Sequence, residues 1–190
     1  MPDALTTTVQ AVHQDSEHRF SKPAVPAIVL QAGLGVVGDA HYGAKVQHRS
    51  RVKANPDQPN LRQVHLISAN LFAHLATLGF QVQAGQLGEN ITLADSAGLG
   101  WHALISLPVD TRLHFGQGPV LQLTGLRNPC VQIDHFQKGL FAAMLDKTAD
   151  GQVIRKTGVM AVVLQGGTVQ VGDSVAVELP PAPHRAMERV

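Results

Sequence analysis

Cys130 is the only cysteine among the 190 residues, and it ends the segment TGLRNPC at residues 124–130. An apolar pattern typical of a strand stops there and a helical pattern begins. A thiol beside Arg127 and near the start of a helix lies where the thiolate is favoured, and the thiolate is the form that attacks electrophiles and binds metals. The alternative is that Cys130 is a small buried hydrophobic residue, which is the commoner role of a lone cysteine.

Asp39 and His41 form a second pair of candidates, in the glycine-flanked segment GDAHYG at residues 38–43. A turn of this kind often exposes functional side chains. His41 could act as a proton donor near neutral pH, because an imidazole titrates in that range. Asp39 could equally do no more than bond to the backbone of its own turn.

The overall composition excludes several classes of protein. Fifteen basic and fourteen acidic side chains nearly cancel, and aromatic residues make up 4% of the chain, so we expect no nucleic-acid partner. One cysteine can form neither an internal disulfide nor a thiolate zinc cluster, and the histidines show no ligand spacing with a carboxylate. Residues 1–20 lack the apolar stretch of a signal peptide, and no segment is apolar enough to span a membrane. We therefore expect a cytoplasmic protein without a membrane partner.

Short runs rich in valine, isoleucine and leucine, separated by glycine and proline, predict strands rather than helices. The predicted strands are 9–12, 27–30, 63–67, 90–93, 111–115, 120–126, 159–164, 168–171 and 174–179. So many short strands indicate a mainly β fold, either a barrel or a sandwich.

Two helices are predicted between the strands. The first runs from Ala69 to Leu78, with Ser68 as its cap and Gly79 at its end. The second runs from about residue 131 to 146, although Gly139 weakens the pattern. The polar and basic residues 47–60 are expected to form a long exposed loop.

The chain length fits one domain, which we place at residues 1–179 with its core at about 25–179. The proline-rich residues 180–190 are expected to form an extended tail that the core does not need.

An ordered series of motifs resembles the MOSC domain, the module named for the C-terminal part of molybdenum cofactor sulfurases. The series consists of GDAHYG at 38–43, RQVHL at 62–66, GENI at 88–91, RNPC at 127–130, GG at 166–167 and GD at 172–173. The resemblance is to the small stand-alone bacterial members of the family. It implies a mainly β fold with some α structure, a MOSC-like β-barrel with a few short flanking helices.

The resemblance also implies a molybdenum cofactor, or molybdopterin, with Cys130 as the metal ligand and a catalytic residue. Cysteine sulfur is a natural donor to a soft metal. Arg62 and Arg127 would hold the phosphate of the cofactor, because a guanidinium binds phosphate through two parallel hydrogen bonds. His41 or Asp39 would transfer protons. On the competing interpretation, Arg127 is only a surface charge near a core cysteine.

Further candidates for cofactor binding follow from the same resemblance. Gly88 ends a glycine turn at residues 85–88, whose N–H groups could meet an anion or whose glycines could serve turn geometry alone. Glu89 and Asn90 could bond to the pterin edge or satisfy buried backbone groups. Basic residues of the 47–60 loop could close over the cofactor or stay solvated. These are Arg49, Arg51 and Lys53.

Three functions remain open. The first is a protein that binds molybdenum cofactor and reduces N-hydroxylated compounds, with a small-molecule substrate and electrons from a separate donor protein. In the second, Cys130 carries sulfur as a persulfide from a sulfur-donor protein, or the barrel carries cofactor, without turnover of its own. The third is a structural domain with an inert cysteine. Pyridoxal phosphate is only a family association, because the domain that binds it is absent from these 190 residues.

Overall fold

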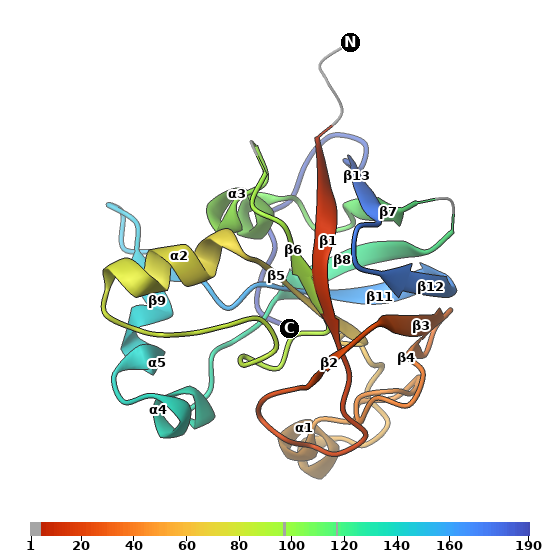
Figure 1. Ribbon diagram of the computed structural model, residues 1–190, viewed down its shortest axis with the longest axis horizontal. Helices are drawn as coiled ribbons and strands as arrows, with labels where there is room; N and C mark the ends of the chain where they lie inside the picture. The colour runs from red at the N-terminus through yellow and green to blue at the C-terminus, as the bar shows by residue number, and fades with distance from the viewer. Residues whose placement is uncertain (1–4, 97, 117) are drawn as a thin grey trace.

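Seven strands close into a β-barrel in the computed structural model, which describes residues 5–96, 98–116 and 118–190, apart from the side chains at 49 and 50. Around the barrel the order is β1-β6-β5-β11-β8-β7-β13, and β13 pairs with β1 to close it (Figure 1). Neighbouring strands are antiparallel except β5 and β6, which are parallel. The seven strands are β1 (Thr6–His13), β5 (Val64–Ser68), β6 (Ile91–Leu93), β7 (Arg112–Phe115), β8 (Val120–Leu126), β11 (Val159–Gln165) and β13 (Ser174–Glu178).

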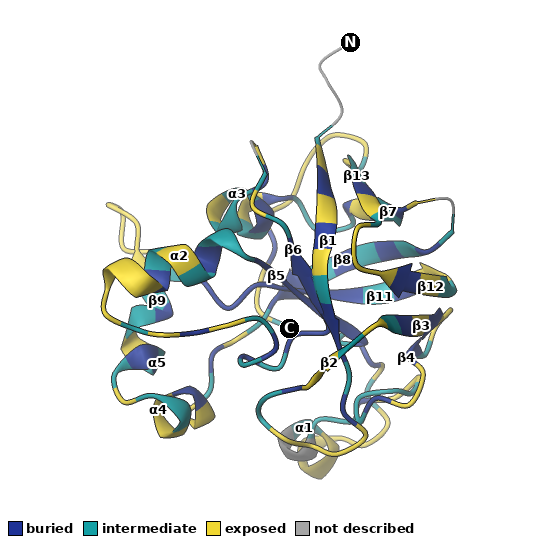
Figure 2. Cartoon of the chain, viewed as in Figure 1, coloured by how far each residue is buried: buried dark blue, intermediate teal, exposed yellow. Residues whose placement is uncertain are grey.

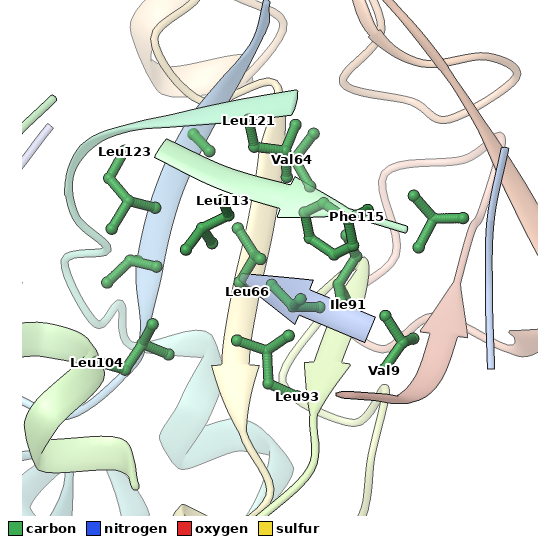
Figure 3. Close-up of a cluster of buried hydrophobic side chains, with 14 of the residues drawn as sticks. Val9, Val64, Leu66, Ile91, Leu93, Leu104, Leu113, Phe115, Leu121 and Leu123 are labelled. Atoms are coloured by element: carbon green, nitrogen blue, oxygen red, sulfur yellow. The ribbon is translucent and has the colours of Figure 1, made fainter. Parts of the chain in front are cut away.

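Aliphatic side chains fill the interior of the barrel (Figure 3). Along β8, buried residues alternate with half-buried ones, because successive side chains of a strand point to opposite faces. Leu121 and Leu123 therefore point inward, where they meet Leu113, Phe115 and Leu66. Burying one such side chain contributes about 1.5–3 kcal/mol, so a cluster of this size can stabilise the barrel without a disulfide.

A smaller sheet and a hairpin flank the barrel. The sheet has the order β12-β3-β4, and β2 extends the barrel sheet at β1. The hairpin joins β9 to β10. These strands are β2 (Ala24–Val25), β3 (Ala27–Gln31), β4 (Gly35–Val36), β9 (Leu145–Lys147), β10 (Val153–Arg155) and β12 (Gly167–Gln170).

Helices α2 (Asn70–Thr77), α4 (Gln132–Phe136) and α5 (Leu140–Ala143) lie together on one side of the barrel, where they form a second core (Figure 1). Helix α2 buries Leu71 and Leu75, which lie on one face because they are four residues apart. They pack with Ile133 of α4 and Leu140 of α5. Figure 2 shows that burial is most continuous along the barrel strands β5 and β6.

The predicted mainly β fold with short helices is confirmed, and each of the nine predicted strands has a counterpart. Six further elements of the described chain were not predicted, namely the short strands β2, β4, β9 and β10 and two helices. The two helices are α1 (Arg49–Ala54) and α3 (Trp101–Ser106). The prediction of a long exposed loop over 47–60 is therefore wrong at residues 49–54, where α1 forms.

The predicted helix over residues 131–146 is wrong as one element. It is divided into α4 and α5, and Gly139 adopts φ +88°, a left-handed conformation that interrupts a helix. Ser68 is not the cap of α2, because its hydroxyl donates to the carbonyl oxygen of Leu99 from within β5. The end of that helix is as predicted, since Gly79 follows it with φ +86°.

Part of the tail at residues 180–190 packs against the barrel. Met187 is buried in the barrel cluster. The N–H of Leu126 donates to Glu188, and the N–H of Val190 donates to Leu126, so the tail follows the end of β8. Gly125 makes this approach possible, because a Cβ there would collide with the backbone oxygen of Glu188 at 2.5 Å.

None of the helices within the described ranges is long and apolar enough to cross a lipid bilayer.

Candidate functional site

A cavity of about 330 Å³ opens beside Cys130, and its lining is rich in positive charge. Arg51, Arg62 and Arg127 line it together with Lys22 and Arg19. Four histidines also contribute to the lining, and they are His18, His41, His48 and His65. Among the described residues, no aspartate or glutamate lines this cavity. We refer to it as the first cavity.

Arg127 directly follows β8 and is half-buried. Its backbone is fixed on both sides, since its N–H donates to Gly158 and its carbonyl oxygen accepts from the hydroxyl of Thr157. Its Nη1 atom is buried without a hydrogen-bond partner. Burial lowers the pKa of Arg127. A buried donor without an acceptor costs free energy, so this atom indicates a missing acceptor in the cavity.

Arg62 lies in the same cluster of positively charged side chains. Burial and the charges of Arg127 and Arg51 lower the pKa of Arg62 to about 10. Among the described residues, none of these three guanidinium groups has a carboxylate within ion-pair distance. By contrast, Arg112 and Arg185 pair with Glu178 and Asp110, respectively. Three guanidinium groups without an ion pair therefore meet at the first cavity, where an anion would relieve their repulsion.

Cys130 lines the first cavity and is partly exposed. Its sulfur lies 3.6 Å from Oε1 of Gln132, a weak contact. Negative charge on this sulfur would raise the pKa of both Arg127 and Arg62, which places the thiol within electrostatic reach of the two guanidinium groups. Cys130 is therefore not a core residue. Helix α4 begins two residues later and is a single short turn, so the arginines are the main positive groups beside the sulfur.

Asp39 is buried behind the cavity, and the expectation that its turn exposes it is wrong. Its Oδ2 atom accepts from Nζ of Lys22 at 2.6 Å and from Nδ2 of Asn90 at 3.0 Å. Its Oδ1 atom accepts from the backbone N–H of His41 at 2.9 Å. Hydrogen bonds from His41 and the charge of Lys22 hold the pKa of Asp39 well below its usual range despite burial. Asp39 is thus an ionised anchor for its neighbours.

His41 lines the first cavity and is oriented by Asp39. Its Nδ1 lies 3.2 Å from Oδ1 of Asp39, which makes Nδ1 the protonated nitrogen and leaves Nε2 as an acceptor. Burial lowers the pKa of His41, so the ring is neutral at pH 7. The rings of His18 and His48 lie 5.1 and 6.3 Å away. Burial and the charge of Arg62 lower the pKa of His48 to about 4.

Gly88, Glu89 and Asn90 mainly satisfy buried groups of the protein. The N–H of Gly88 donates to Gly85, and the N–H of Gly85 donates to Oε1 of Glu89 at 2.5 Å. Neither N–H group is therefore available to an anion. Asn90 donates to Asp39 and accepts from the N–H of His65. Gly88 and Asn90 still line the first cavity, whereas Glu89 lies fully buried outside its lining.

The basic residues of the 47–60 segment differ in whether they line the first cavity. Arg51 lines the first cavity, whereas Lys53 is exposed outside its lining. The side chain of Arg49 lies outside the described residues. The sequence did not suggest Lys22, His18, Arg19 or Gln132. The only signal that could have identified any of these four residues was closeness to Cys130 in the sequence, and it applies to Gln132 alone.

A family model described as the MOSC domain matches residues 38–176. The chain belongs to the MOSC domain family.

Solved structures with the same fold include the YuaD protein of Bacillus subtilis, which is 19% identical with a TM-score of 0.73 and covers 95% of this chain and 100% of its own. YiiM of Escherichia coli is 15% identical with a TM-score of 0.61, over 95% of this chain and 73% of its own. YiiM of Geobacillus stearothermophilus is 14% identical with a TM-score of 0.62, over 96% and 80%. No curated protein matches the sequence significantly.

The MOSC family is associated with molybdenum cofactor, and the residues of the first cavity fit that group. The cofactor needs a soft ligand for its metal and cations for its phosphate. Cys130 supplies the thiol, and the unpartnered Nη1 of Arg127 supplies a donor without an acceptor. The cavity also contains no carboxylate lining that would repel an anion, among the residues described.

Proposed function

We propose that this MOSC protein binds molybdenum cofactor in the first cavity and reduces N-hydroxylated compounds with electrons from a separate donor protein. One observation carries the proposal: guanidinium groups without an ion pair, one of them with a buried and unpartnered Nη1 atom, line the same cavity as the only thiol of the chain. Such a group of cations favours an anionic ligand, and the thiol adds a donor for a soft metal.

In this proposal Cys130 is the protein ligand to molybdenum, and Arg127 and Arg62 hold the cofactor phosphate. The bound cofactor would supply a redox centre that exchanges two electrons. Lys22 is already paired with Asp39, so it adds positive potential without being the primary phosphate ligand. Asn90 fixes the position of Asp39.

His41 is the proposed proton donor. Its neutral ring accepts a proton from solvent at Nε2, while Nδ1 stays bonded to Asp39. The ionised carboxylate of Asp39 stabilises the imidazolium that forms. Reduction of an N–OH group to N–H consumes two electrons and two protons and releases water, so a relay of this kind would serve the reaction.

The experiment is to produce the protein in a host that makes molybdenum cofactor and to measure bound metal and pterin. We expect about one molybdenum per chain, and a fluorescent pterin after oxidation. Cys130→Ser should lose the metal while keeping the fold, because the two side chains are similar in size. Arg127→Met should lose the pterin, whereas Arg112→Met is a matched control outside the cavity.

Unchanged molybdenum content in the Cys130→Ser protein would remove the thiol from the proposal. If the metal is bound, a chemically reduced electron donor and an N-hydroxylated compound test the reaction itself. Failure to form the reduced nitrogen product would then refute the reductase while leaving cofactor binding in place.

A sulfur carrier is the second candidate, and the partial exposure of Cys130 at a cationic cavity favours it. The Cys130 thiolate would attack the outer sulfur of a persulfide on a donor protein, the donor cysteine would leave as a thiolate, and nearby arginines would stabilise the new persulfide anion. This function predicts a sulfur-sized mass increase on Cys130 in protein that contains no metal.

A further inference from the structure

A second cavity of about 220 Å³ adjoins the first one. Arg51 and Arg62 line both cavities. Arg189 lines only the second cavity, whereas Arg127 lines only the first. Apolar walls complete the second cavity, and they come from Val46, Pro59, Leu61 and Val190.

The second cavity repeats the charge imbalance of the first. Within the described residues, neither Arg51, Arg62 nor Arg189 forms an ion pair, and no acidic side chain lines the second cavity. Arginines elsewhere do find acceptors: Arg185 pairs with Asp110, and Arg155 donates to Asn128. Three guanidinium groups therefore share one small space in which no described side chain supplies a negative charge.

The walls of the second cavity are held in place by hydrogen bonds, as a binding site requires. Asn60 is buried and donates to the carbonyl oxygens of His41 and Gly43, while it accepts from the N–H of Arg62. Val190, which also lines this cavity, is held by the bond from its N–H to the carbonyl oxygen of Leu126. Rigid walls spare a ligand the cost of ordering them.

We propose that the second cavity binds a phosphate group of the substrate, so that the N-hydroxylated compounds reduced at the first cavity are phosphorylated ones. This inference rests on the proposed function. A phosphate monoester carries up to two negative charges, which Arg51 and Arg189 can match while Arg62 also faces the cofactor phosphate, and guanidinium groups bind phosphate oxygens in pairs. The apolar walls would contact the carbon atoms next to the phosphate. Because Arg51 and Arg62 belong to both cavities, a phosphate held there lies beside the first one.

The first test is titration calorimetry of the purified protein with phenyl phosphate and with inorganic phosphate. We expect phenyl phosphate to bind more tightly, because its ring can use the apolar walls. Arg189→Gln should weaken binding of both by about ten-fold or more, since one charged hydrogen-bond donor is lost. Arg112→Gln, at an exposed arginine outside both cavities, is the matched control and should leave binding unchanged. Equal binding by the Arg189→Gln and unaltered proteins would overturn the inference.

The second test separates this inference from the proposed function. Arg189→Gln should retain full molybdenum content, whereas Arg127→Gln should lose it and keep phenyl phosphate binding. In the reductase assay, a phosphorylated N-hydroxylated compound should have a kcat/KM about ten-fold or more above its unphosphorylated form, and Arg189→Gln should abolish that preference. The inference would be overturned if the unaltered protein showed no preference for the phosphorylated compound. It would also be overturned if a nucleotide were released together with the pterin, because the second cavity would then belong to the cofactor. Protein without molybdenum that still needs Arg189 for phosphate binding would refute the reductase but support the anion site.

Discussion

Replacing Asp39 by asparagine should destabilise the protein strongly, because this carboxylate is the partner of a buried ammonium group. Lys22 and Asp39 are 3% and 1% exposed in their side chains, and Nζ lies 2.6 Å from Oδ2. An asparagine there would lose the charge and could turn its NH₂ group toward Lys22 and Asn90, which are both donors. Removing one partner of a buried ion pair costs about 3–5 kcal/mol.

Urea unfolding at pH 7, followed by circular dichroism, measures this loss. With a urea dependence of about 2 kcal/mol per molar, a loss of 3–5 kcal/mol lowers the midpoint by roughly 1.5–2.5 M. Asp57→Asn is the matched control, since Asp57 pairs with Lys45 at the surface, where the side chains are 78% and 63% exposed. Its midpoint should stay close to that of the unaltered protein, because exposed ion pairs contribute little.

The pH dependence gives the same prediction a second readout. Burial lowers the pKa of Lys22, and loss of Asp39 should lower it further. Between that folded pKa and the unfolded value of about 10.4, the unfolded chain binds more protons, so stability rises with pH. The deficit of Asp39→Asn should therefore shrink as the pH rises toward the folded pKa that Lys22 has in the unaltered protein. A midpoint equal to that of Asp57→Asn, or a deficit independent of pH, would refute the counter-ion role.

Three other substitutions test the fold around the site. Gly158→Ala should lower the free energy of unfolding by more than about 3 kcal/mol, because Gly158 has φ +83° and a Cβ there would overlap the carbonyl oxygen of Leu66. Gly33→Ala, at φ +72° in open space, should lower it by only about 1 kcal/mol. Equal urea midpoints of the two variants would contradict this prediction. Met187→Ala should cost about 2–5 kcal/mol in urea unfolding, since the side chain is buried in the barrel core, and an unchanged midpoint would make the tail dispensable. Burial raises the pKa of Glu89, so the folded protein binds more protons than the unfolded chain and stability falls as pH rises above the usual carboxyl range. Glu89→Gln should remove this decline, which thermal unfolding from pH 5 to 8 measures. Parallel plots of unfolding temperature against pH for the two proteins would be the contrary result.

The strands were predictable because their signal is local. In β8, alternation of apolar residues coincides with alternation of burial, so the sequence alone identifies the face that enters the barrel. The interrupted helix shows the limit of that reasoning. Apolar spacing continues from Ile133 to Leu140, but the left-handed backbone of Gly139 separates two short helices whose apolar residues pack into the same core.

The site was predictable in part for a similar reason. Arg127 and Cys130 are neighbours in the chain, so their proximity could be expected, and both line the first cavity. Lys22 could not be found in this way, since its partner Asp39 is 17 residues away and nothing nearby distinguishes it from a surface lysine. The burial of Asp39 likewise depends on the meeting of three distant segments, which no local pattern records.

The pairing of β1 with β13 has a consequence for how the chain reaches its folded state. Residues 6–8 pair with residues 174–176, so the barrel can close only after the intervening residues have been synthesised. Bringing such distant segments together carries a large entropic barrier, and folding rates fall as contacts become less local. Until closure, both strands expose unpaired edges that another nascent chain can capture. Aggregation during synthesis is therefore the hazard that this topology creates, and it ends when the first and last strands of the barrel meet.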